Sequence, residues 1–218
     1  MSNQDSFIDE VTEEVKRDRL YGLMRRYGWI PVVVVLGIVG GTAYREYNRA
    51  TEQAAAESFG DSILTALEVE EIPARISALS EITTGDSDEK AVLEMLIAAE
   101  EGVDGDDAAA IARLQSVAND TAVPNIYRQI ASYKALSRAS DILSSDERKA
   151  GFESLAVAGQ PLRVLAEEQL ALIEIESGDA EAAMKRLRAL ISDAEASAGL
   201  RRRATQLIVA LGGSVDAG

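Results

Sequence analysis

The sequence of 218 residues contains no cysteine and no histidine. Without cysteine the chain can form no disulfide, no thiolate metal site and no thiol nucleophile. Without histidine it lacks the commonest general base, the commonest zinc ligand and the Ser-His-Asp relay. An enzyme built from this chain would depend on carboxylates, lysine or tyrosine alone. Composition therefore favours a protein that is not an enzyme, and we expect no catalytic residues, no metal site and no cofactor.

Positive charge is in the minority, and proline is scarce. The chain has 22 basic and 37 acidic residues, a net charge of −15, and only four prolines. A surface this negative repels phosphate backbones, so nucleic acid is not an expected partner. The length corresponds to one domain with appendages, and it is sufficient for a hydrophobic core without metals or disulfides.

Charged residues are absent from the stretch 27–44, which reads YGWIPVVVVLGIVGGTAY. A helix of this length, rising about 1.5 Å per residue, approaches the thickness of a bilayer core of about 30 Å. We therefore predict a transmembrane helix at 27–44. Aromatic rings stand at its ends, as is typical of the membrane interface, and a proline stands in its first turn, where helices accept it. Two glycines four residues apart either allow close packing against another span or merely tolerate lipid. The residues expected to define this anchor are Trp29, Pro31, Val35, Gly37 and Gly41.

Basic residues crowd the N-terminal side of this stretch, whereas only two arginines follow it closely. Since positive charge is retained in the cytoplasm, we expect a cytoplasmic N-terminus and an exported C-terminal region. Residues 1–26 are predicted to be a charged tail with the spacing of an amphipathic helix, either a partner-binding segment or a solvated extension. Gly41-Thr42-Ala43 also resembles a signal-peptide cleavage site, but a leader with six acidic residues favours a retained anchor.

The remainder of the chain shows helical periodicity and no credible strand. Residues 45–72 are predicted to form a long linking helix, and residues 73–218 a domain of helix pairs. Proline is accepted in the first turn of a helix, where its missing N–H costs little. The prolines that precede predicted helices in this way are Pro73, Pro124 and Pro161.

Internal repetition is the strongest feature of the domain. Residues 105–114, GDDAAAIARL, match residues 178–187, GDAEAAMKRL, at an offset of 73. Half of this offset is close to the period of about 34 residues of helix–turn–helix repeats, so a further pair is expected at 124–140 and 146–158. In each copy Gly-Asp makes the turn and caps the second helix. A final helix near 200–211 is expected to cap the array.

The repeated residues resemble the tetratricopeptide repeat. The Trp and Tyr positions of that pattern hold glutamate instead, Glu94 and Glu101 in one copy and Glu167 and Glu174 in the other. The resemblance implies an all-α fold, a TPR-like α-solenoid of helix-turn-helix pairs following one N-terminal transmembrane helix. The matching positions are Ile97, Ala98, Gly105, Asp106, Ala110 and Leu114, and Leu170, Ala171, Gly178, Asp179, Ala183 and Leu187.

The layout of tail, anchor, linking helix and divergent repeats resembles the YfgM-like family, ancillary subunits of the bacterial SecYEG translocon. The resemblance implies a single-pass inner-membrane protein whose periplasmic domain is a scaffold for protein–protein interactions at the translocon. The partners that it implies are translocon subunits, periplasmic chaperones or exported clients, with no small-molecule substrate. An assembly factor or accessory subunit of another inner-membrane complex is the alternative.

Repeat arrays of this kind bind polypeptide segments along the concave face formed by their first helices. That face either holds an apolar segment of a partner or is filled by another helix of the same chain. A carboxylate-dependent hydrolase, the remote alternative, needs two carboxyl groups about 5–10 Å apart across a cleft. The residues predicted to line the concave face are Val92, Met95, Ala99, Leu165, Leu172 and Ile175.

Two acidic runs, 86–89 and 104–107, precede predicted helices. Neither has the glycine and the terminal glutamate that an EF-hand loop needs. Acidic residues at helix starts complement the positive end of the helix dipole, so we predict helix caps and not calcium ligands. Arg201, Arg202 and Arg203 are expected to form a solvated helix face and not an anion-docking point.

Overall fold

The computed structural model describes residues 24–214, and within them the side chains of all but residues 31 and 32. In this range the chain is helical, with turns between helices and no β-strand, so the all-α prediction is confirmed. The helices are α2 (Trp29–Leu67), α3 (Ile72–Ser80), α4 (Ser87–Asp104), α5 (Asp107–Asn119), α6 (Asn125–Arg138), the 3-10 helix η1 (Ala139–Asp141), α7 (Ser145–Leu155), α8 (Arg163–Glu176), α9 (Ala180–Ser192) and α10 (Ala198–Ala210).

The chain divides into two compact units, residues 1–58 and residues 59–218. The first unit contains most of α2, including the described part of the predicted anchor, and the apolar side chains there are exposed, Leu36 at 65%. Between residues 24 and 214, no helix combines the length and the apolarity needed to cross a membrane. The predicted tail, 1–26, lies almost entirely outside the described residues.

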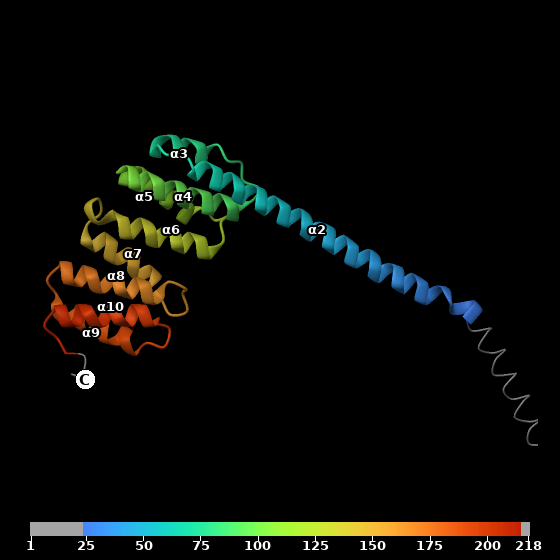
Figure 1. Ribbon diagram of the computed structural model, residues 1–218. Helices are drawn as coiled ribbons and strands as arrows, with labels where there is room; N and C mark the ends of the chain where they lie inside the picture. Colours follow the sequence, from blue (N-terminus) through green and yellow to red (C-terminus); the bar gives the residue numbers. More distant parts are fainter. Residues whose placement is uncertain (1–23, 215–218) are drawn as a thin grey trace, which may run out of the picture. The chain divides into compact units, whose positions relative to one another are not determined.

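In the second unit each helix packs against its neighbour in the chain, an arrangement consistent with a helical solenoid (Figure 1). The hydrophobic core is accordingly a series of clusters. The last turns of α2 pack with α3 and α4 around Leu79 and Ile97, and α7 and α8 share a cluster around Phe152. Each helix pair thus buries its apolar face against the next pair, as expected for repeats that cannot form a core alone.

The turns follow the predicted chemistry. Gly105 ends α4 with φ 91°, a left-handed conformation that glycine adopts without steric cost. The next residue, Asp106, caps α5 by accepting a hydrogen bond from the Ala109 N–H at 2.9 Å. Asp86 caps α4 in the same way, accepting from the N–H groups of two residues. The acidic runs are therefore helix caps, as predicted.

The offset of 73 extends well beyond the matched ten residues. Shifted by 73, the bounds of α5 coincide with those of α9, and α6 starts where α10 starts. The chain thus contains two equivalent blocks of three helices, α4–α5–α6 and α8–α9–α10, with α7 between them. The predicted pair at 124–140 and 146–158 corresponds to α6 and α7. Equivalent positions that are both buried include Ile97 and Leu170, Ala98 and Ala171, Ala110 and Ala183, Leu114 and Leu187, Val117 and Leu190, and Ala131 and Ala204.

Candidate functional site: two ion clamps and a four-helix groove

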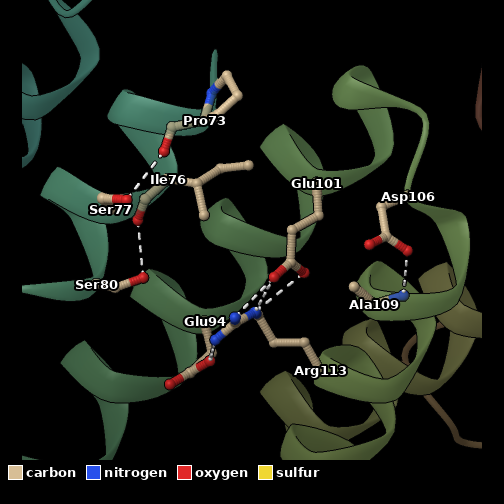
Figure 2. A network of polar contacts seen from close by, with 9 residues as sticks. All are labelled: Pro73, Ile76, Ser77, Ser80, Glu94, Glu101, Asp106, Ala109 and Arg113. Atoms are coloured by element: carbon tan, nitrogen blue, oxygen red, sulfur yellow. Dashed lines mark hydrogen bonds and ion pairs between the residues drawn. The ribbon is translucent and has the colours of Figure 1, made fainter. Parts of the chain in front are cut away.

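The glutamates that replace Trp and Tyr in the repeat pattern are held by arginine. Arg113 on α5 reaches Glu94 and Glu101, which lie two helical turns apart on α4 (Figure 2). Its Nη1 is 2.6 Å from Glu94, and its Nη2 is 2.7 Å from Glu101. The Nε also donates to Glu101, at 3.0 Å, so this carboxylate is bound by two nitrogens.

The same arrangement recurs in the second block. Arg186 on α9 donates to both Glu167 and Glu174 on α8, with Nη2 2.7 Å from Glu174. We call each set of one arginine and two glutamates an ion clamp. The second glutamate of each ion clamp is nearly buried: the side chain of Glu101 is 10% exposed and that of Glu174 is 9% exposed. Hydrogen bonding to Glu101 raises the pKa of Arg113, and hydrogen bonding to Glu174 raises that of Arg186.

Each ion clamp lies in a cleft between the two helices that it joins. The α4–α5 cleft has a volume of about 460 Å³ and the α8–α9 cleft about 420 Å³. A second ion pair stands at the end of each, Lys90 with Asp120 and Arg163 with Asp193. Hydrogen bonds from Arg163 lower the pKa of Asp193. These charges satisfy one another within the chain, so the ion pairs cross-link the two helices of each cleft.

A different pair of clefts lies between the first helices of successive pairs. The α4–α6 cleft has a volume of about 250 Å³ and contains Met95, Ala99 and Tyr133. The α8–α10 cleft has a volume of about 460 Å³ and contains Leu172 and Gln206, the equivalents of Ala99 and Tyr133 at the offset of 73.

The two clefts are neighbours across the contact between α6 and α8. Tyr133, in the α4–α6 cleft, interacts with Gln169, which lines the α8–α10 cleft, and with Ser137. Its ring also packs edge-on against Phe152 at a centroid distance of 5.7 Å, which fixes its position. Burial raises the pKa of its hydroxyl. We call the two neighbouring clefts together the four-helix groove, since α4, α6, α8 and α10 supply all of its lining residues except Leu114 of α5.

The structure places only some of the predicted concave-face residues in this groove. Met95 and Ala99 line the α4–α6 cleft, and Leu172 lines the α8–α10 cleft. Val92 is exposed outside both linings, and Leu165 and Ile175 are half-buried outside them. Binding of a partner by these six residues stays a prediction.

The predicted anchor residues lie on an open helix surface. The side chains of Trp29 and Val35 are exposed. At Gly37 and Gly41 an added Cβ would meet no atom within 4 Å, so nothing described packs on this glycine pair. Pro31 lies in α2, and its side chain is not among those described.

Sequence reasoning missed the ion pair inside the groove. Arg203 binds Glu168 with two parallel hydrogen bonds, Nε to Oε1 and Nη2 to Oε2, both 2.7 Å. Arg201 donates to the backbone oxygen of Asp193 at 2.7 Å. The arginine triplet is therefore only partly the solvated face that was predicted. The available signal was the offset, because Glu168 and Arg203 replace Met95 and Ile130 together.

Residues 24–214 contain no group of three or more aspartates and glutamates placed to hold a metal ion. No protein-family model, no curated protein and no solved structure matches this chain.

Proposed function

We propose that this protein is a membrane-anchored, non-catalytic scaffold that holds a segment of a partner polypeptide in the four-helix groove. The observation that carries the proposal is the recurrence of the cleft at equivalent positions in both blocks, with Tyr133 of one cleft interacting with Gln169 of the other. Repeat arrays expose such a surface along their first helices, and extended or helical segments bind there.

The chemistry of the lining suits a polypeptide. Met95, Leu114 and Leu172 supply apolar contact area, while Ser137 and the glutamines at 169 and 206 supply hydrogen-bonding groups. Peptide-binding sites combine apolar pockets for side chains with polar groups for the backbone. A small-molecule site would instead be expected to enclose most of its ligand.

The non-catalytic part of the proposal is supported by the state of the paired glutamates. Glu94 and Glu101 both line the α4–α5 cleft from α4, and Arg113 of α5 binds both. A carboxyl group that acts as a general acid must be able to carry a proton at the operating pH. A guanidinium in contact with the carboxylate opposes that protonation. These glutamates are therefore expected to stabilise the fold and not to react.

The membrane anchor is a separate part of the proposal. It is supported by the exposed apolar side chains of α2, among them Trp29 and Leu36, which would otherwise face water. A flotation experiment with the full chain and lipid vesicles tests it: co-flotation that persists in alkaline carbonate supports an anchor, and recovery in the aqueous fraction contradicts one.

The cellular setting that we propose is the bacterial inner membrane, with the N-terminus in the cytoplasm and the repeat domain in the periplasm at the SecYEG translocon. It is supported by the resemblance of the chain's layout to the YfgM-like family. An accessory subunit of another inner-membrane complex would have the same architecture. The identity of the bound partner separates the two.

A site-specific crosslink tests the scaffold function and the setting together. A photoreactive residue at Ala210, exposed in the α8–α10 cleft, is compared with one at Ala189, exposed in the α8–α9 cleft. We expect a crosslinked polypeptide at position 210 and far less at 189, with translocon subunits or periplasmic chaperones among the products. Equal labelling at both positions would contradict groove binding, and products from another membrane complex would contradict the translocon.

A further inference from the structure

The charge of the four-helix groove is opposite to that of the chain as a whole. The chain carries a net charge of −15, yet α6 and α10, which are equivalent helices, each contain three basic residues and no acidic residue. The other two groove helices hold many of the acids: α4 has six acidic residues and one basic residue, and α8 has four and one.

The acidic helices direct most of their carboxylates away from the groove. Glu94, Glu101, Glu167 and Glu174 are held in the ion clamps, in clefts that do not include α6 or α10. Glu100 on α4 pairs with Arg75 on α3 at 2.7 Å. The exception is Glu168, which lines the groove, and Arg203 neutralises it there. Most carboxylates of α4 and α8 that form ion pairs thus form them outside the groove.

Three of the six basic residues of α6 and α10 line the groove. Lys134 and Arg138 line the α4–α6 cleft, and no acidic residue lines it. Arg138 pairs with Asp107, whereas Lys134 is exposed and has no ion-pair partner among residues 24–214. In the α8–α10 cleft, Arg203 pairs with Glu168. Lys134 is therefore the one cation of the groove lining without an ion-pair partner among the described residues, and a lone cation beside apolar side chains matches a ligand that offers a carboxylate and apolar side chains together.

We propose that the segment bound in the four-helix groove is acidic and apolar, with a carboxylate that pairs with Lys134 and apolar side chains that contact Met95 and Leu172. This inference rests on the proposed scaffold function and adds the chemistry of the partner. The acidic remainder of the surface repels such a segment, so the groove is the place where it can bind. Repulsion from the rest of the surface therefore contributes to specificity for the groove, together with attraction inside it.

The test uses the full chain in nanodiscs of zwitterionic lipid, with empty nanodiscs as the blank. Three fluorescein-labelled peptides of the same length alternate leucine with glutamate, with glutamine or with lysine, and fluorescence anisotropy measures their binding. We expect the glutamate peptide to bind roughly tenfold more tightly than the glutamine peptide, as one desolvated charge pair allows. This preference should weaken in high salt, and the lysine peptide should bind least.

Two matched variants locate the site. Lys134→Glu reverses one exposed charge in the groove, and Lys185→Glu makes the same change at an exposed lysine of the α8–α9 cleft. We expect Lys134→Glu to weaken binding of the glutamate peptide roughly tenfold and Lys185→Glu to weaken it less than about twofold. Circular dichroism checks that both variants are folded. Equal effects of the two variants, or none, would overturn the proposal.

A third variant separates this inference from the scaffold function. Ser137→Trp places a large ring in the α4–α6 cleft from an exposed position. If the glutamine and glutamate peptides bind equally and Ser137→Trp abolishes both, the groove binds polypeptides and the acidic preference is wrong. If binding of all three peptides is insensitive to Ser137→Trp, or if no peptide binds, both claims are contradicted: the groove is not the binding site, and the partner segment is not an acidic one bound there.

Discussion

Removing the arginine of an ion clamp should destabilise the repeat domain more than its partial exposure suggests. In Arg113→Met the methionine preserves much of the aliphatic side chain but leaves two carboxylates facing each other without a cation. The Glu101 side chain is only 10% exposed and Glu94 is 29% exposed. Exposed ion pairs contribute about 0.2–1 kcal/mol, and breaking a fully buried pair costs about 3–5 kcal/mol. We therefore expect a loss of about 2–3 kcal/mol in the free energy of unfolding.

The charge-free counterpart of this variant provides the control. Glu94→Leu, Glu101→Leu and Arg113→Leu together remove the whole clamp and leave no unpaired charge. Replacing a complete buried ion pair by apolar residues is often neutral or stabilising, so the triple variant should unfold within about 1 kcal/mol of the parent chain. Urea unfolding followed by circular dichroism of the full chain in mild detergent measures both values.

The second block offers an independent repetition of the experiment. Arg186→Met should cost a similar amount, and the double variant should lose the sum, because the two clamps share no residue. The reasoning fails if Arg113→Met costs less than about 0.5 kcal/mol, the range of a neutral surface change. It also fails if the triple variant is as unstable as the single one, since the loss would then not come from unpaired charge.

Three further predictions concern the fold. Leu187→Ala, at a fully buried position, should lower the free energy of unfolding by about 2–5 kcal/mol, while Leu64→Ala, at an exposed one, should change it by less than about 0.5 kcal/mol, both by urea titration. Arg163 donates hydrogen bonds to Asp193 and lowers the pKa of its carboxyl group in the folded state. The ionised carboxylate therefore stabilises the fold at pH values above its unfolded pKa of about 3.9. This stabilisation is lost as the pH falls through the pKa of the folded state. Asp193→Asn should therefore flatten the decline of the melting temperature below about pH 4, and an unchanged decline would contradict the assignment. Ser144 caps α7 in a capping box with Glu147, so Ser144→Ala should cost about 0.5–2 kcal/mol, and Ser145→Ala, one position later, should lower the melting temperature far less.

The parts of the fold that depend on neighbouring residues were predictable from the sequence. The glycine of the Gly-Asp pair ends one helix and the aspartate caps the next, so the starts of α5 and α9 followed from a short motif. The offset of 73 likewise predicted an additional helix pair, and α6 and α7 are found there. Helix caps and apolar periodicity act within one or two turns, which is why one sequence suffices to read them.

The ion clamps depended on which side chains meet across two helices. Glu94 and Glu101 appeared in the sequence only as departures from an aromatic pattern. Their meaning depends on Arg113, about two turns of α5 beyond the Gly-Asp motif, and on the crossing of α4 and α5, which the sequence does not specify. The pairing of Glu168 with Arg203, 35 residues apart in the chain, likewise depends on how two helices meet. The offset of 73 offered one clue to each: the arginine repeated at 113 and 186 for the ion clamps, and the joint replacement of Met95 and Ile130 for this pair.

The equivalence of α6 and α10 also bears on how long the array could become. Leu136 of α6 packs into the cluster around Phe152, whereas its equivalent on α10, Val209, is 60% exposed. The helix face that α6 packs against the Phe152 cluster is therefore exposed on α10, where Gln206 occupies the position equivalent to Tyr133. A hairpin copied from α7 and α8 and inserted after Gly213 would meet a partly prepared surface, and Gln206→Tyr would restore the missing ring. The array could therefore be lengthened with copies of its own helices.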